Sequence, residues 1–491
     1  MTVQSTKKIC IHGHFYQPPR EDPFTHRVPN EHGAAPYLNF NEKITAECYK
    51  PNAEAGNFEH ISFDFGPTLA DWLEHNAADV YHRIIASDKA ALERDGVGSA
   101  IAHAYNHTIL PLANSRDKRA QISWGIQDFQ NRFGRWPEGM WLAETAIDIE
   151  CLEILKDYNI AFTILAPWQS LGGVDSTEPY WVALPSGRRI AVFFYDGHLS
   201  GGASFVDSVT ENADAFVADI ITHHVNWEKA AAGEDQLISV ATDGELYGHH
   251  KPFRDRFLTQ LIQNSAPAFG YEVTTYAKYL RDHPPVKETR IYAPSAWSCA
   301  HGVDRWNVGC ACTEGEPQKW KPGLRDSLNQ LAEKIDTLFA EYTAATLKDP
   351  WLAREEYISL RNEWITEQHF WEKHSVHGRK PFRETHAARI WHLLEAEYYM
   401  QASYTSCGWF FEDIDRIEPR NDINYARCAI SHVWQALHIN LQDAFVANLA
   451  ATTHSWRSPL SGAAIYTQLP PPPAQGILPP LKKRGRKEPA A

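Results

Sequence analysis

Residues 236–250 read QLISVATDGELYGHH, and this stretch sets the pattern for the first 300 residues. Its first half is a short run rich in Leu, Ile and Val, which is typical of a buried parallel strand. Asp243, Glu245, His249 and His250 follow directly. Polar turns often end strands, and Asp-Gly is a common turn pair. Because barrel enzymes hold their reactive groups at strand ends, the alternative is a functional site.

Five further runs have the same strand-like character, at residues 8–15, 99–105, 139–144, 160–166 and 189–197. Segments with apolar residues at helical spacing, such as residues 68–92 and 148–159, lie between them. The repeated alternation, about six or seven units, predicts a closed or nearly closed α/β barrel in preference to an open sheet.

From about residue 310 the apolar residues follow helical spacing, which predicts a mostly helical region. One helical stripe has apolar residues at steps of three and four, namely Leu324, Leu328, Leu331, Ile335, Leu338 and Tyr342. The end of the chain is Pro-rich and carries the basic cluster KKRGRK, which is typical of a disordered tail with solvated charge. We therefore expect a barrel over residues 1–309, a helical domain over 310–455 and a tail over 456–491.

Composition limits the classes of function. The net charge of −14 disfavours nucleic-acid binding by the main body, because that binding requires Lys and Arg to neutralise phosphates. Neither a signal-type apolar region nor a membrane-length apolar run is found in the sequence, and eight irregularly spaced Cys do not indicate a disulfide framework. We expect a cytoplasmic protein without a membrane partner, and the sequence does not indicate its oligomeric state.

Ionisable groups concentrate at the ends of four expected strands. They are His12 and His14, then His103 and His107, then Glu144, and finally Asp243. A lone His is more often a hydrogen-bonded structural residue than a ligand, but four such groups at strand ends indicate a site. Two carboxylates from different strands could serve as the pair that glycosidases require.

Five short blocks, in order, resemble glycoside hydrolase family 57. They are HGHFYQP (12–18), HTILPL (107–112), GMWLAET (139–145), TDGELYGHH (242–250) and APSAWSCAHG (293–302). The resemblance implies an incomplete (β/α)7 barrel followed by a helical region, a retaining mechanism on α-glucans or oligosaccharides, and no metal or other cofactor. With SCGWFFEDI (406–414), the chain resembles a bacterial subgroup with an additional helical domain.

The resemblance also implies roles for individual residues. Glu144 matches the family's nucleophile, and Asp243 matches its general acid/base. Further residues are expected to contact substrate, namely His12, His14, His107, Trp141, Glu245, His249 and Trp297. Whether the reaction is hydrolysis, chain transfer or branching stays open.

Two other functions remain possible. The His residues of HGH (12–14) and DGELYGHH (243–250), with a carboxylate, could bind Zn²⁺ in a metal-dependent polysaccharide deacetylase. A carbohydrate-binding protein on a degenerate barrel would keep the aromatic residues but would not need both Glu144 and Asp243. Separately, Cys299, His301, Cys310 and Cys312 could bind a structural zinc, or could be buried reduced thiols and a histidine.

Overall fold

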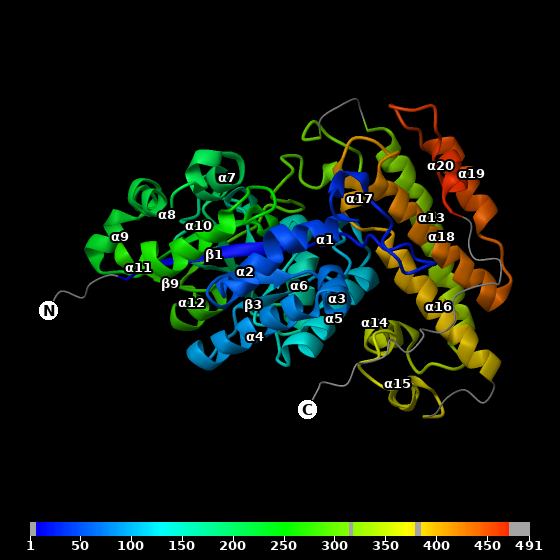
Figure 1. Ribbon diagram of the computed structural model, residues 1–491. Helices are drawn as coiled ribbons and strands as arrows, with labels where there is room; N and C mark the ends of the chain where they lie inside the picture. Colours follow the sequence, from blue (N-terminus) through cyan, green and yellow to red (C-terminus); the bar gives the residue numbers. More distant parts are fainter. Residues whose placement is uncertain (1–5, 314–317, 379–383, 471–491) are drawn as a thin grey trace. The chain divides into compact units, whose positions relative to one another are not determined.

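A computed structural model of the protein describes residues 6–313, 318–378 and 384–470. The chain forms two compact units (Figure 1). The first comprises Met1–Pro19 and Pro29–Val303, and the second comprises Arg20–Val28 and Asp304–Ala491. Each unit is described separately below.

Seven parallel strands form the curled sheet of the first unit. In chain order they are β1 (Lys7–Phe15), β2 (Ser62–Phe65), β3 (Ala100–His103), β4 (Met140–Trp141), β5 (Phe162–Leu165), β7 (Arg189–Phe194) and β8 (Gln236–Asp243). The order β8-β1-β2-β3-β4 continues through a parallel bridge between Gly139 and Phe162 to β5 and then β7. The edge strands β7 and β8 do not pair as a ladder. They are joined by one bond from the loop after β7, in which Asp196 N donates to Ser239 O (2.9 Å). The predicted incomplete (β/α)7 barrel is confirmed.

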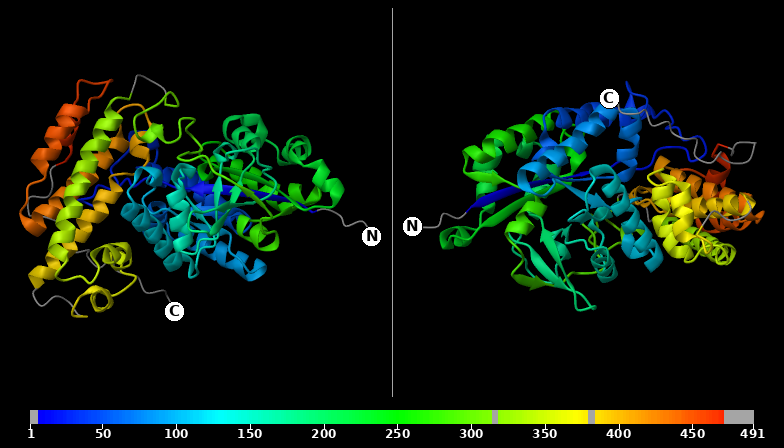
Figure 2. Two further views of the ribbon diagram at one scale, coloured as in Figure 1. Left: turned by 180° about the vertical axis from the view of Figure 1, so that it is seen from behind. Right: turned by 90° about the horizontal axis from the view of Figure 1, so that it is seen from below.

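Helices cover the outside of this sheet (Figures 1 and 2). The longer ones are α3 (Pro67–Asn76), α4 (Ala78–Asp95), α5 (Ser115–Phe133), α6 (Ile149–Asp157), α7 (Gly197–Phe205), α10 (Arg254–Gln260) and α12 (Tyr276–Asp282). Asn114 caps α5 by accepting a hydrogen bond from Asp117 N, and Gly134 ends that helix with φ 69°. Since helices lie on one side and side chains fill the interior, the strands are buried on both faces, which explains their almost continuous apolar character.

All six predicted strands are present. The sequence-based prediction missed β2, because four residues reading SFDF give too short a run and include the charged Asp64. It also missed three short strands, β6 (Tyr180–Ala183), β9 (Tyr271–Val273) and β10 (Lys287–Thr289). Of these, β9 pairs in parallel with the first residues of β1, and β6 is antiparallel to β7.

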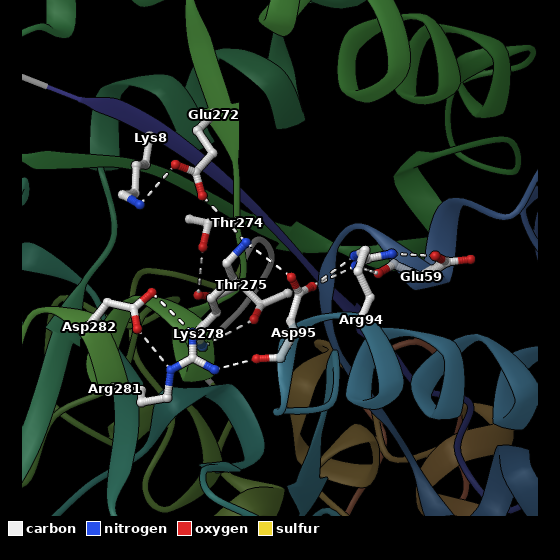
Figure 3. A network of polar contacts seen from close by, with 10 residues as sticks. All are labelled: Lys8, Glu59, Arg94, Asp95, Glu272, Thr274, Thr275, Lys278, Arg281 and Asp282. Atoms are coloured by element: carbon white, nitrogen blue, oxygen red, sulfur yellow. Dashed lines mark hydrogen bonds and ion pairs between the residues drawn. The ribbon is translucent and has the colours of Figure 1, made fainter.

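A network of ion pairs closes the amino-terminal end of the barrel (Figure 3). Lys8 Nζ, at the start of β1, lies 2.9 Å from Glu272 Oε2 of β9. Lys278 Nζ of α12 lies 3.3 Å from Glu272 Oε1 and 3.1 Å from Asp95 Oδ1, at the end of α4. Arg94 Nη2 pairs with Asp95 Oδ2 (2.7 Å). The network thus joins β1, β9, α12 and α4 at the end of the sheet opposite to the strand ends that carry the predicted site.

The second unit is helical. Its helices are α13 (Trp320–Thr343), α14 (Pro350–Arg361), α15 (Glu367–His374), α16 (Glu384–Ala402), α17 (Cys407–Phe410), α18 (Ile417–Leu437), α19 (Gln442–Thr452) and α20 (Gly462–Gln468). Five of the six residues in the predicted stripe of α13 are buried. Tyr342 is the exception, with 40% of its surface exposed, whereas Thr343 beside it in the last turn is buried. Trp409 is buried and packs against the Arg325 guanidinium, 4.6 Å from the ring centre.

A short segment from near the amino terminus belongs to this helical unit. Tyr425 Oη donates to Glu21 O (2.9 Å), and Asn424 Nδ2 donates to Asp22 Oδ2 (2.9 Å). The predicted limits 1–309, 310–455 and 456–491 treat each part as continuous, and they remain predictions. Helix α20 lies inside the stretch predicted as tail, whereas the basic cluster at 482–487 lies outside the described residues. None of the helices in the described ranges is long and apolar enough to cross a membrane.

Candidate active site

Two buried histidines of β1 share one buried carboxylate of β2. In the sheet register, His12 pairs with Ser62 and His14 with Asp64. His14 Nδ1 lies 2.8 Å from Asp64 Oδ2, and His12 Nε2 lies 3.2 Å from Asp64 Oδ1. His12 Nδ1 is also 3.1 Å from Ser62 Oγ. His12 is completely buried and bonded on both ring nitrogens, so its role here is to hold Asp64 in position.

His14 is the charged member of this group. Burial acts against its charged form, but Asp64, with smaller contributions from Asp243 and Glu245, outweighs burial and raises the pKa of His14 to about 9. Burial would raise the pKa of Asp64, but His14, together with His12 and His103, lowers it below its usual range. The pair is therefore an imidazolium and a carboxylate at neutral pH.

His103, the last residue of β3, and His107, which follows the strand, are neutral. Burial lowers the pKa of His103 to about 4 and that of His107 well below its usual value. His107 Nε2 lies 3.1 Å from His14 Nε2, so the protonated His14 can donate to it. The Tyr16 ring stacks on His107 with 3.9 Å between ring centres. This arrangement fixes the position of the His14 proton.

Glu144 is held in an uncommon backbone conformation just after β4. Its φ of 58° and ψ of 22° lie in the left-handed region, which non-Gly residues seldom adopt. Its Oε2 accepts hydrogen bonds from Trp297 Nε1 (2.8 Å) and Ser298 Oγ (2.6 Å). Trp297 N also donates to Glu144 O (3.0 Å), so both the backbone and the carboxylate are fixed.

Asp243 ends β8 beside these groups. It pairs in register with His14, on the side of β1 opposite to Asp64, and its side chain is exposed. Burial raises the pKa of Glu144, and the charge of Asp243 adds to this, against the hydrogen bonds from Ser298 and Trp297. The two carboxylates proposed for catalysis are thus electrostatically coupled and differ in their exposure to solvent.

A third carboxylate, Glu245, lies next to Asp243 and is buried. Glu245 Oε1 accepts hydrogen bonds from Tyr49 Oη (2.6 Å) and Tyr16 N (3.2 Å). Burial raises its pKa to about 7, with Asp243 adding to the effect and the Tyr49 bond opposing it. Glu245 therefore changes charge near neutral pH.

The two predicted tryptophans lie at different depths. Trp297 is half-buried and bonded to Glu144. Trp141 has 0% of its surface exposed and stacks on His12 with 4.7 Å between ring centres. The rings of Trp141 and Trp297 meet edge to face at 5.1 Å. Trp141 thus packs against the rings of His12 and His14. Its predicted contact with substrate remains a prediction.

The His249 backbone N donates to Glu245 O (3.1 Å), but its ring pairs with a residue outside the cluster, and its predicted contact with substrate stays a prediction. His249 Nδ1 lies 2.6 Å from Glu47 Oε2, in a segment that precedes β2. Within the described residues, the ligand set imagined for a deacetylase, His from 12–14 with His from 243–250, is not brought together as a group of three. His12 is bonded to Ser62 and Asp64 instead, and the deacetylase ligand set stays a prediction.

Three histidines of the first unit could hold a metal, and one of them, His14, belongs to the ligand set expected from the sequence. Ligand atoms of His14, His103 and His107 lie within 4.8 Å of one another. The structural zinc expected at Cys299, His301, Cys310 and Cys312 stays a prediction. A metal at the three histidines would require His14 to release its Nε2 proton, because a ligating nitrogen must be unprotonated.

Sequence reasoning missed Asp64, Tyr49 and Ser298. Of these, Asp64 would have been the easiest to predict, because a charged residue inside an apolar strand needs a partner when it is buried. Tyr49 and Ser298 carry no such signal, since their roles depend on contacts with Glu245 and Glu144, far away in sequence.

Two solved structures have similar folds. An exo-type maltose-forming amylase from Pyrococcus sp. ST04 matches with a TM-score of 0.74 at 16% identity, over 91% of this chain and 83% of that one. A branching enzyme from Pyrococcus horikoshii matches with a TM-score of 0.61 at 14% identity, over 96% of this chain and 99% of that one.

Sequence comparison gives the family. Alpha-amylase 1 of Dictyoglomus thermophilum is 22% identical over 328 residues, which cover 62% of this chain and 42% of that protein. The chain therefore spans less than half the length of this relative. Residues 317–475 match a domain of unknown function, DUF3536. Residues 11–294 match glycosyl hydrolase family 57, and the chain belongs to this family.

Proposed function

We propose that the protein is a retaining enzyme acting on α-glucans, with Glu144 as nucleophile and Asp243 as general acid/base. The observation that carries this proposal is the fixing of Glu144 by Trp297 and Ser298, in a left-handed backbone conformation, beside a second carboxylate on another strand. The relatives named as amylases and a branching enzyme support the substrate class.

The different surroundings of the two carboxylates suit different roles. In the first step, Glu144 attacks the anomeric carbon while Asp243 gives its proton to the departing glycosidic oxygen. In the second step, Asp243 takes a proton from water or a sugar hydroxyl, which attacks the same carbon and releases Glu144. Hydrolysis and transfer differ only in this second acceptor.

The imidazolium of His14 supports the nucleophile. Its charge acts to lower the pKa of Glu144, against the effect of burial and of Asp243. A cation held by Asp64 therefore helps to keep Glu144 ionised, as a nucleophile must be. Neutral His107, which is bonded to His14, offers polar atoms for a sugar hydroxyl.

The test is to identify products from maltooligosaccharides, amylose and glycogen. Proton NMR at early times should show the α-anomer as the first reducing product, because double displacement retains configuration. Release of the β-anomer first would overturn the retaining assignment. A protein that binds these glucans but converts none of them would support the non-catalytic alternative.

Transfer and branching are measured in the same samples. New chain lengths without a rise in reducing ends indicate transfer, and new branch points in amylose indicate branching. The cytoplasmic location is part of this proposal and is tested by cell fractionation.

A further inference from the structure

An exposed tryptophan lies at the carboxyl end of the barrel, the end that carries the candidate active site. Trp168 follows β5 in the 3-10 turn Pro167–Gln169, and 51% of its surface is exposed. Exposure alone would carry no argument, because single apolar side chains are common on protein surfaces. The position of Trp168 is informative because its ring is fixed and is linked to the residues that hold Glu144.

The Trp168 ring is held in one orientation. Its Nε1 donates to Ala296 O (3.2 Å), so its polar atom is already bonded and the rest of the ring is apolar. The ring meets that of Tyr195 edge to face, with 6.2 Å between ring centres. A Cβ at Gly197 would lie 3.2 Å from Trp168 Cζ3 and crowd the ring, so this glycine leaves room for it.

The buried side chain of Gln169 joins this turn to the segment that carries Glu144. Gln169 Nε2 donates to Thr145 O (2.9 Å) and to Ser295 Oγ (3.1 Å). Gln169 Oε1 accepts a hydrogen bond from Thr145 Oγ1 (2.7 Å). Since Thr145 directly follows Glu144, buried hydrogen bonds fix the position of Trp168 relative to the proposed nucleophile. A side chain fixed in this way loses little freedom when a ligand binds.

A row of aromatic rings leads from Trp168 to Glu144. Tyr195 meets Trp297 edge to face at 6.4 Å between ring centres, and Trp297 Nε1 donates to Glu144 Oε2 (2.8 Å). Burial raises the pKa of the Tyr195 hydroxyl and the charge of Asp243 adds to this, so Tyr195 lies within electrostatic reach of the proposed acid/base. Trp168 is thus the exposed end of a row whose other end holds the nucleophile.

We propose that Trp168 is a stacking platform for a glucosyl unit in a subsite next to the one at Glu144. This inference rests on the proposed function on α-glucans. The C–H groups of a glucopyranose ring form apolar faces, so a flat aromatic ring can cover one face while the hydroxyl groups stay in water. Because no bond to this unit changes in the reaction, Trp168 should act on KM more than on kcat.

The first experiment is hydroxyl-radical footprinting of full-length Glu144→Gln protein, with oxidation read by peptide mass spectrometry. Maltoheptaose should lower the oxidation rate of Trp168. Trp227 is the matched control, because 57% of its surface is exposed and it lies near Lys7, at the opposite end of β1. The oxidation rate of Trp227 should not change. An unprotected Trp168, or equal protection of both tryptophans, would overturn the proposal.

The second experiment measures the Kd for maltoheptaose by calorimetry in the same Glu144→Gln background. Trp168→Ala should raise the Kd by about tenfold or more, because truncating a tryptophan that anchors a ligand removes much of its binding energy. Trp168→Phe should keep most of the affinity, whereas Trp168→Leu should not, because leucine is apolar but not flat. Trp227→Ala should bind like its parent protein.

The outcomes separate this inference from the proposed function. Unchanged affinity in Trp168→Ala, in a protein that converts glucans, would overturn the platform alone. Glucan binding that depends on Trp168, without conversion by the wild type, would overturn the catalytic proposal alone. A protein that binds no glucan would overturn both. If Trp168→Ala does not fold, the footprinting of the unsubstituted ring decides.

Discussion

The two ends of the barrel sheet hold charge in opposite ways. At the amino-terminal end, Lys8, Lys278, Asp95 and Glu272 alternate in sign, and Glu272 is more than a third exposed (Figure 3). At the carboxyl end, Asp64 and His14 are buried, and the ring nitrogens of the buried His103 have no hydrogen-bond partner among the described residues.

This difference separates stability from chemistry. Water can reach the partly exposed side chains of the amino-terminal network and replace a lost partner, so each ion pair there contributes little. In the buried cluster, each charge depends on one particular partner, and removing the partner shifts the pKa of the other groups. Substitutions at the carboxyl end should therefore change activity and pH dependence, whereas those at the other end should change stability alone.

The largest effect is expected from Glu144→Gln. The amide keeps the shape of the side chain but cannot form the glycosyl-enzyme bond, so kcat should fall by at least about a thousandfold. Thermal unfolding should remain within a few degrees of wild type. Glu153→Gln is a suitable control, because Glu153 pairs with Arg188 and has no place in the proposed site. Activity near that of wild type in Glu144→Gln would remove this residue from the mechanism.

Asp64→Asn should be next in size. The amide cannot balance a buried imidazolium, so His14 should lose its proton at neutral pH, and activity should fall by about a hundredfold. NMR of the His14 ring should show this loss of charge. Asp282→Asn, an exposed carboxylate at the other end of the barrel, is the control. A His14 that stays protonated in Asp64→Asn would show that Asp64 does not set its charge.

The same pair gives a pH dependence of stability. The folded pKa of His14 is about 9, above the unfolded value of about 6.5, so its contribution is complete below pH 6.5 and is lost as pH rises through 9. The free energy of unfolding of the wild type should therefore fall by up to about 3 kcal/mol across this window, relative to His14→Gln. If the free energy of unfolding changed equally with pH in the wild type and in His14→Gln, this contribution of His14 would be contradicted.

How far the sequence predicted this cluster depends on distance along the chain. His12, His14, Glu144 and Asp243 were found because each follows a recognisable apolar run. The role of Asp64 was not found, because it arises from the β1–β2 register, which joins residues separated by 50 positions. Likewise, the bond from His249 to Glu47 spans 202 positions and shows no local signal.

The fold was more predictable than the contacts. Six barrel strands follow from short apolar runs, and the buried stripe of α13 follows from helical periodicity; both signals are local in the sequence. The strand β2 was missed because its four residues are too few for a period to show. The expected burial of Tyr342 was wrong, because at this end of α13 the buried residues are Phe339 and Thr343, which lie beside the predicted stripe.

A smaller effect is expected from Glu245→Gln. Since the pKa of Glu245 is about 7, the wild type gains a buried negative charge beside Asp243 between pH 6 and 8. The logarithm of kcat/KM should therefore bend near pH 7 in the wild type and lose this bend in the variant, with a change in rate of no more than about tenfold. Retention of the bend in Glu245→Gln would assign it to another group.

The smallest effect should come from Lys278→Ala at the amino-terminal end. This change removes the link between Asp95 and Glu272, but Arg94 still neutralises Asp95, and Lys8 still neutralises Glu272. Because the Lys278 side chain is 22% exposed, water can also solvate the two carboxylates, and unfolding should be easier by only about 1 kcal/mol. Chemical denaturation at low and high salt measures this, and the difference should shrink in high salt because the pairs are screened. Activity at a temperature where both proteins are folded should be unchanged. A loss of kcat in Lys278→Ala comparable to that in Asp64→Asn would show that the two ends of the barrel are coupled, and the separation of stability from chemistry would then fail.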